Sequence, residues 1–172
     1  MVLFILEKNI DSDTFIKECL SRYIELSKKM NLEVKEECLN EENFLDKVKI
    51  NRDTKPYLTI DDKKIDIYFN ISHTDGAMVA LFSNEEVGVD IEKIKERNFK
   101  KVAKRENIEC SSLDEFIAKW TQCEAYIKLK NMHLTDISKN KEFDFSIVKT
   151  IDILKNYYIS FAPNKETIII IL

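Results

Sequence analysis

Glycine and proline are scarce in this sequence: of 172 residues, two are glycine, Gly76 and Gly88, and two are proline. The chain accordingly has no Pro/Gly-rich linker and no low-complexity stretch at which it would divide. A hydrophobic content of 44% is enough for a packed interior and excludes general disorder. We therefore expect one globular unit over residues 1–172, or two small halves that share a core.

Long hydrophobic runs are also missing. Val2–Leu6 is too short for a secretion signal and is followed by the charged residues Glu7 and Lys8. Ile168–Leu172 is far too short to cross a bilayer and is typical of a buried strand. These features predict a cytoplasmic protein with no membrane segment.

The spacing of a zinc site is absent from the four cysteines, Cys19, Cys38, Cys110 and Cys123. Without a secretion signal they are most simply reduced thiols, and Cys19 falls on the apolar face of an expected helix. A neighbouring cation could activate Cys123 as a nucleophile. No other residue completes such a site, so we do not favour a catalytic thiol.

Each half of the sequence opens with an expected strand and continues into helix. In order, we expect a strand at Val2–Leu6, a helix at about Thr14–Met30, an acidic stretch at Glu33–Asp46, strands through Ile65–Ile71 and at Ala77–Phe82 and Val87–Glu92, helices to about Leu129, and strand-like segments at Phe143–Lys149, Thr150–Leu154, Tyr157–Ala162 and Thr167–Leu172. The halves share no identity that would indicate a duplication.

Two carboxylates share one face of the expected strand Val87–Glu92. Side chains alternate along a strand, so its three apolar residues point one way while Asp90 and Glu92 point the other. Their Cα atoms are then roughly 6.6 Å apart, and side chains leaning together across that gap can reach one small hard cation.

A third carboxylate, Glu124, interrupts the apolar stripe of an expected helix. The segment Ser112–Glu115 matches a capping box and predicts the start of that helix. Apolar residues then recur at three- and four-residue steps, with Glu124 near the middle of their stripe and Lys128 at its edge. A carboxylate there must be neutralised or paired. Two interpretations stay open: an i,i+4 ion pair with Lys128, or a metal site shared with Asp90 and Glu92.

Three segments that occur in order carry a family resemblance. They are Phe69–His73 (FNISH), Val87–Glu92 (VGVDIE) and Trp120–Lys128 (WTQCEAYIK), and Lys55-Pro56-Tyr57 precedes them. Together they resemble the 4′-phosphopantetheinyl transferases of the surfactin-synthetase-activating type. The resemblance implies an α+β fold of two similar subdomains related by a pseudo-two-fold, with approximate halves 1–74 and 75–172 and the active site between them.

The resemblance also implies an activity that depends on Mg²⁺, with Mn²⁺ as an alternative metal. The 4′-phosphopantetheine arm of coenzyme A passes to a serine of an acyl or peptidyl carrier protein, and 3′,5′-ADP is released. A pyrophosphate needs cations beside it, and the serine needs a base to take its proton. By resemblance, the metal-binding acids are Asp90, Glu92 and Glu124, the catalytic residues are Glu124 and Lys128, and the coenzyme A contacts are Lys55, Ser72, His73 and Lys128. For His73 the alternative is a half-buried core histidine.

The sequence departs from the family pattern at several positions. Cys123 stands where a lysine is usual, which removes a cation next to Glu124, and Thr54 replaces the usual glycine before Lys55. The segment Asn98–Asp114 is short and lacks the usual aromatic pair. The N-terminal half lacks the arginine-rich helix that binds the 3′-phosphate, and its nearest candidates are Arg22, Lys28 and Lys29.

Positive charge is concentrated in Lys93–Arg105, which holds seven basic residues and one acidic residue in a chain of net charge −4. The ordinary interpretation is the solvated face of a helix, with Phe99, Val102 and Ala103 turned inwards. The segment could also meet an acidic carrier protein or the phosphates of coenzyme A.

Two further classes of function stay open. In some Mg²⁺-dependent nucleases a strand with Asp-x-Glu is followed by lysines, and the basic segment would then contact DNA. That interpretation leaves Asn70–His73 and Trp120–Lys128 unexplained. A non-catalytic paralogue that binds coenzyme A or a carrier protein would suit the cysteine at position 123. We favour the active transferase, a monomer whose partners are coenzyme A and the carrier protein, without nucleic acid or membrane.

Overall fold

The computed structural model describes residues 1–30, 43–53, 55–139 and 143–172. The elements in chain order are β1 (Val2–Leu6), α1 (Ser12–Lys29), α2 (Phe44–Lys47), β2 (Val48–Asn51), β3 (Tyr57–Ile60), β4 (Lys63–Lys64), β5 (Tyr68–Thr74), β6 (Ala77–Ser83), β7 (Gly88–Lys93), α3 (Phe99–Glu106), α4 (Leu113–Lys130), α5 (Thr135–Ser138), the 3-10 helix η2 (Phe145–Ile147), β8 (Lys149–Ile151), β9 (Tyr157–Ala162) and β10 (Ile168–Ile171). This mixture of helices and strands confirms the α+β fold class.

The strands of the described residues form three sheets. The first has the order β10-β1-β6-β5, in which β1 runs parallel to β10 and the other pairs are antiparallel. The second is the antiparallel sheet β7-β9-β8. The third, β2-β3-β4, is a small antiparallel sheet. Because β10 returns to pair with β1, the end of the described chain is part of the first sheet.

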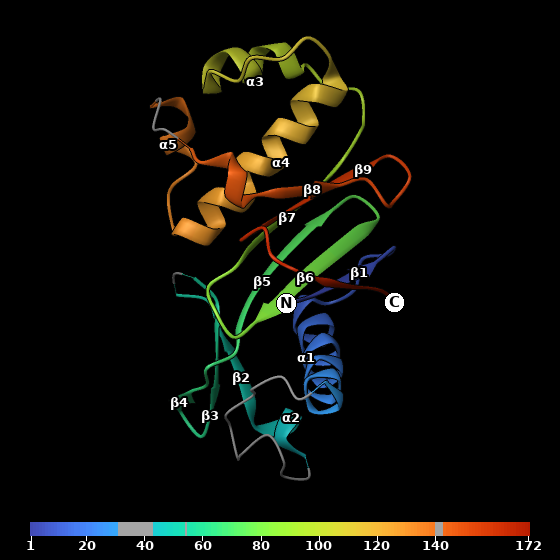
Figure 1. Cartoon of the computed structure of the whole chain (residues 1–172), viewed down its shortest axis with the longest axis vertical. Coiled ribbons are helices and arrows are strands. Elements are labelled where there is room, and N and C mark those ends of the chain that lie inside the picture. Colours follow the sequence, from blue (N-terminus) through green and yellow to red (C-terminus); the bar gives the residue numbers. More distant parts are fainter. Residues whose placement is uncertain (31–42, 54, 140–142) are drawn as a thin grey trace.

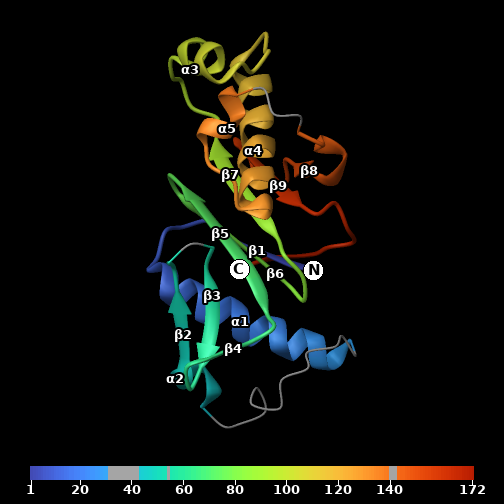
Figure 2. The ribbon, with the colours of Figure 1, turned by 90° about the vertical axis from the view of Figure 1, so that its left-hand side faces the viewer.

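The first sheet lies between two apolar cores. On one face, Val2 and Phe4 of β1 pack with the buried side of α1. On the other face, Leu3 and Ile5 pack with apolar residues of β7 and β9. The opposite side of the second sheet is covered by α4, so the layers follow the order α1, first sheet, second sheet, α4 (Figure 1). Strand β7 lies between β5 and α4, as Figures 1 and 2 both show.

The two long helices begin at side-chain caps. The Asp11 side chain accepts a hydrogen bond from the backbone N–H of Thr14 at 2.9 Å, and α1 therefore starts slightly before the predicted Thr14. The Ser112 hydroxyl accepts from the N–H of Glu115 at 3.1 Å, which confirms the predicted start of α4. The Glu115 carboxylate accepts from the N–H of Ser111 at 2.7 Å.

Two other interpretations of the sequence are confirmed by burial. Cys19 is fully buried in the core between α1 and the first sheet. In the basic segment, Ala103 is buried, and Phe99 and Val102 pack with it against α4, as expected for the inward side of α3. Cys38, Thr54 and most of the acidic stretch Glu33–Asp46 lie outside the described residues.

The C-terminal region differs from the prediction in two places. The segment Phe143–Lys149 is a strand only at Lys149, where β8 begins, because the Asp144 side chain accepts from the N–H of Ser146 at 3.1 Å and starts the 3-10 helix η2. Strand β10 was expected to be buried, but it lies at the edge of the first sheet. Its residues Ile169 and Ile171 are exposed, so that expectation is wrong for one of its two faces.

The proposed boundary between halves 1–74 and 75–172 falls in the turn between β5 and β6, and the division and its pseudo-two-fold stay predictions. Among the described residues, none of the helices has the length and apolar character needed to cross a bilayer.

Candidate active site

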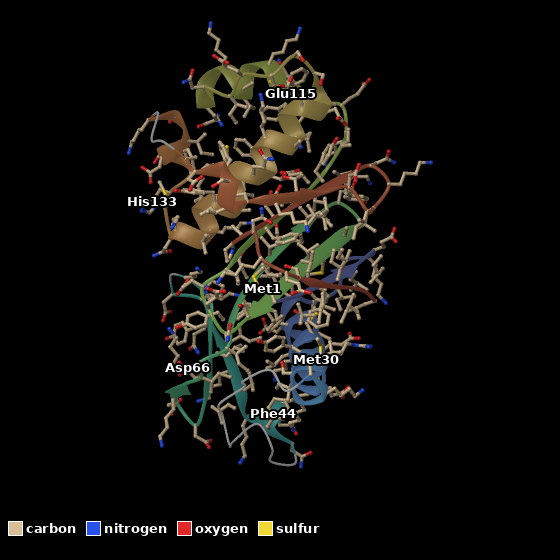
Figure 3. All side chains as sticks on the ribbon, viewed as in Figure 1. Met1, Met30, Phe44, Asp66, Glu115 and His133 are labelled. Carbon is tan, nitrogen blue, oxygen red and sulfur yellow. The ribbon has the colours of Figure 1, made fainter. Side chains whose placement is uncertain are left out.

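The three motif segments meet where β5, β7 and α4 lie side by side. Figure 3 labels Glu115, in the first turn of α4, and His133, which lies shortly after the end of the helix at Lys130. The first contact joins β5 to β7: the amide oxygen of Asn70 accepts a hydrogen bond from the backbone N–H of Val89 at 3.1 Å, in the interior. Sequence reasoning included Asn70 in a motif but gave it no role, and this bond shows that it helps to fix the position of β7 against β5.

Asp90 is the centre of the site. Its oxygen Oδ1 accepts hydrogen bonds from the Ser72 hydroxyl at 2.7 Å and from the Lys128 ammonium at 2.7 Å. The same ammonium donates to the carbonyl of Val89 at 3.1 Å. The Asp90 side chain is 8% exposed and that of Lys128 26% exposed. One residue from each of three separate motifs therefore converges on a single carboxylate oxygen.

Gly88 allows α4 to approach β7 closely. A Cβ atom at this position would lie 2.1 Å from the carbonyl oxygen of Ala125 and 2.5 Å from the backbone nitrogen of Leu129. Neither backbone atom can move without displacing the helix. Only glycine permits this packing, which brings Lys128 within reach of Asp90.

A chain of buried hydroxyl groups holds the middle of α4 against the second sheet. The Thr121 and Ser160 hydroxyls are 2.8 Å apart, and Ser160 lies 2.9 Å from the Thr150 hydroxyl. The side-chain amide of Gln122 donates to Thr150 at 2.9 Å. Ser160 is also the β9 partner of Asp90 in the strand register. The helix carrying Glu124 and Lys128 is therefore fixed on the same face of the sheet as Asp90.

Glu124 is half-buried beside these groups. The pKa of its carboxyl group is raised to about 7, mainly by burial and then by the negative charge of Asp90; Glu92 adds to the rise and the positive charge of Lys128 opposes it. The i,i+4 ion pair with Lys128, one of the two interpretations left open, is not formed among the described residues, because the lysine binds Asp90 instead. A carboxyl group with a pKa near neutrality exchanges protons readily at physiological pH.

Glu92 has a different partner, which sequence reasoning missed. Its Oε2 lies 3.0 Å from Nη2 of Arg97, a residue of the connection between β7 and α3. The only sequence signal was the position of Arg97 inside the basic segment, five residues after Glu92.

Of the residues predicted to contact coenzyme A, Ser72 lies at Asp90, whereas His73 and Lys55 lie elsewhere. Ser72 points towards Asp90, whereas His73, the next residue of β5, is exposed and alternates to the other side of the strand. The core-histidine interpretation of His73 is therefore wrong. Lys55 lies at the C-terminal end of α4, where it pairs with Glu86 and donates to the carbonyl of Leu129 at 3.2 Å.

The basic residues of α1 are separated from this site by the first sheet. Arg22, Lys28 and Lys29 are exposed on α1, and the first sheet lies between that helix and the second sheet. Arg22 pairs with Glu18 one turn away on the same helix. The structure does not bring these three residues together with Asp90.

Cys123 belongs to a core and not to the carboxylate cluster. It is 5% exposed and packs with Ile127 and Ile137. Burial raises the pKa of its thiol to about 12. It also lines a cavity of about 330 Å³ between α3, α4 and Phe143. A protonated, buried thiol is a poor nucleophile, in agreement with our preference against a catalytic cysteine.

The side chains at this site supply the type of donor atom that a divalent cation binds. The second oxygen of Asp90, Oδ2, is buried and has no hydrogen-bond partner, and carboxylate oxygens are the ligands that Mg²⁺ prefers. Among the described residues, no three His, Cys, Asp or Glu side chains are gathered closely enough to hold a metal. Asp90 could offer Oδ2 to a metal while its Oδ1 keeps the contact with Lys128, and Glu124 would not have to leave an ion pair among the described residues. Glu92, in contrast, is bound to Arg97.

Comparison with known proteins gives one partial match of interest. No protein-family model matches the chain. A stretch of 73 residues is 37% identical to the 4′-phosphopantetheinyl transferase gsp of Aneurinibacillus migulanus, and the match covers 37% of this chain. It spans 31%, under a third, of the length of that relative. Part of this chain is therefore similar in sequence to a 4′-phosphopantetheinyl transferase.

Proposed function

We propose that this protein is a 4′-phosphopantetheinyl transferase that uses coenzyme A, Mg²⁺ and a carrier protein. The observation that carries the proposal is the meeting of Ser72, Asp90 and Lys128 at one carboxylate oxygen, with Glu124 beside them. The three motifs that produced the family resemblance are far apart in sequence, and chance matches would have no reason to converge. The partial match to a relative with this printed name supports the same reaction.

In the proposed reaction the serine hydroxyl oxygen of the carrier forms a bond to the phosphorus that carries the pantetheine arm. The bond from that phosphorus to the bridging oxygen of the pyrophosphate breaks, and 3′,5′-ADP leaves. Glu124 takes the serine proton, a role that its pKa of about 7 suits. A bound Mg²⁺ would supply charge neutralisation at the pyrophosphate oxygens.

Lys128 is the residue best placed to stabilise the leaving group. Its ammonium has three donors, of which Asp90 and the Val89 carbonyl receive two. The remaining donor can contact a phosphate oxygen while the lysine stays anchored. Asp90 therefore has two roles in the proposal: it holds Lys128 through Oδ1 and offers Oδ2 to the metal.

The proposal is tested by mass spectrometry of carrier proteins. The full chain is mixed with coenzyme A, Mg²⁺ and several apo carrier proteins of fatty-acid, polyketide and peptide synthesis. The expected result is a carrier whose mass increases by one phosphopantetheine group, with no increase for Asp90→Ala, for Glu124→Gln or in excess chelator. An unmodified set of carriers, together with coenzyme A binding measured by calorimetry, would favour the non-catalytic paralogue instead.

A further inference from the structure

Each of the two strand carboxylates has its own side-chain cation. Asp90 is paired with Lys128 at 2.7 Å, and Glu92 is paired with Arg97 at 3.0 Å. A divalent metal bound by these acids would occupy a place where two positive charges already lie close by. Lys128 is explained by the proposed reaction, whereas Arg97 matches no part of the motif and has no role in it.

The guanidinium of Arg97 is held in a defined position. It lies over the ring of Phe116, with its central carbon 6.0 Å from the ring centroid. Phe116 is 1% exposed and stacks with Trp120, so the platform under the guanidinium is rigid. The Nε atom of Arg97 is buried and has no hydrogen-bond partner. Glu92 is thus the described anion that holds this arginine, and the pair is only partly exposed, at 30% for Arg97 and 22% for Glu92.

We propose that Arg97 is an internal counter-ion that competes with the divalent metal for Glu92 and so sets the metal affinity of the site. The inference rests on the proposed function, because it assumes that Glu92 is a metal ligand. In the metal-free protein the guanidinium neutralises Glu92 and keeps it from joining Asp90 and Glu124. In this arrangement Asp90, Glu92 and Glu124 do not form a metal-binding group among the described residues.

Two physical effects oppose metal binding in this arrangement. The metal must replace the charge-assisted hydrogen bond between Glu92 and Arg97, and the arginine then loses an acceptor while its Nε is already unpaired. A guanidinium close to the metal also repels it directly. An anionic substrate that enters the site would offer Arg97 a new partner and release Glu92 to the metal. Metal and substrate therefore favour each other's binding.

The opposite role for Arg97 makes the opposite prediction. A residue that hydrogen-bonds a metal ligand can orient that ligand, and its removal then weakens metal binding. The sign of the change in metal affinity on removing Arg97 therefore decides between a competing counter-ion and a positioning residue.

The experiment measures Mn²⁺ binding to the full chain by isothermal titration calorimetry, without substrate, so that the readout does not depend on turnover. Arg97→Met should lower the Kd for Mn²⁺ by about threefold to tenfold, because a partly exposed charge acts over a short distance. Lys95→Met is the matched control: it removes the same charge from an exposed residue of the same segment and should change Kd less. Arg97→Lys, which keeps the charge, should resemble the parent protein.

The effect must also depend on Glu92. In a Glu92→Gln background, Arg97→Met should no longer tighten Mn²⁺ binding. If Arg97→Met does not fold, Arg97→Gln replaces it. Its amide can still donate to Glu92 and lie over Phe116, which preserves the fold, while the loss of charge should again lower the Kd for Mn²⁺. The inference is overturned by an unchanged or raised Kd in Arg97→Met and Arg97→Gln, by an effect equal to that of Lys95→Met, or by a parent protein that binds no Mn²⁺. Carrier modification in saturating Mg²⁺, measured on the same variants, reports separately on the proposed function.

Discussion

The Lys128 ammonium and the Asp90 carboxylate are 2.7 Å apart although 38 residues separate them in the sequence. Their contact joins a helix to a strand and fixes a cation next to a buried anion. Since the Asp90 side chain is 8% exposed, this partner and the Ser72 hydroxyl replace the water that would otherwise contact its Oδ1. Removing either charge alone therefore has consequences for stability as well as for activity.

Lys128→Met is expected to abolish carrier modification and to lower the free energy of unfolding by about 3 kcal/mol, because it leaves Asp90 buried without its cation. The measurements are carrier mass and urea denaturation. The double variant Asp90→Asn/Lys128→Met should regain much of the stability and none of the activity. A single variant as stable as the parent protein would show that the pair contributes little and that solvent reaches Asp90 freely.

Gly88→Ala is expected to displace α4 from β7. A Cβ atom 2.1 Å from the Ala125 carbonyl cannot be accommodated locally, so the substitution should cost about 3 kcal/mol of stability and most of the activity. Gly76→Ala is the matched control, since Gly76 has a φ of +83° in the β5–β6 turn and its substitution strains the backbone away from the site. Gly76→Ala should destabilise while keeping activity below its melting temperature, and equal activity losses would contradict the role given to Gly88.

Local patterns predicted much of this site, and long-range contacts explain what they missed. Alternation along Val87–Glu92 correctly separated the buried apolar residues from Asp90, because a strand fixes the direction of each side chain. Helical spacing also placed Glu124 near the middle of an apolar stripe, and the structure has it half-buried. The same spacing suggested an ion pair with Lys128, yet the lysine binds Asp90, whose position depends on how α4 packs on β7. No periodicity contains that information.

The same limit applies to the residues that join the site from connections. Arg97 looked like one of seven cations on a solvated face, but the tertiary fold turns it onto Phe116 and towards Glu92. Cys123 was interpreted from the sequence as the loss of a cation next to Glu124, whereas the structure buries it. Its contact with Ile137 depends on the placement of α5, which no helical pattern of α4 specifies.

The raised pKa of Glu124 predicts that stability decreases with pH. The folded-state value is about 7, above the ordinary value of 4.5, so between these values the folded protein binds a proton that the unfolded chain has released. The stabilisation is therefore present below about pH 4.5 and is lost as pH rises through about 7. In chelator, the parent protein should lose about 1–2 kcal/mol over this range relative to Glu124→Gln, after allowance for solvent screening. Identical pH profiles of the melting temperature for the two proteins would contradict this.

Cys123→Lys introduces the residue that is usual at this position in the family that the chain resembles. The structure predicts that the new lysine will not act as a functional cation. The side chain at position 123 is 5% exposed and faces the apolar cluster of Ile127 and Ile137, so a lysine there would place an ammonium among apolar groups. We expect a loss of about 2 kcal/mol or more in the free energy of unfolding and no gain in kcat or in coenzyme A affinity.

Cys123→Ala is the matched control for that substitution. It removes the thiol without adding charge and should cost only about 1 kcal/mol, because alanine leaves a small void beside the existing cavity. Melting temperature and steady-state kinetics on both variants separate charge from packing. A lysine variant that melts like the alanine variant and turns over faster would show that the ammonium escapes the core and reaches the pyrophosphate. A cation at position 123 could then still act on the pyrophosphate, and the native cysteine would cost the protein catalytic charge.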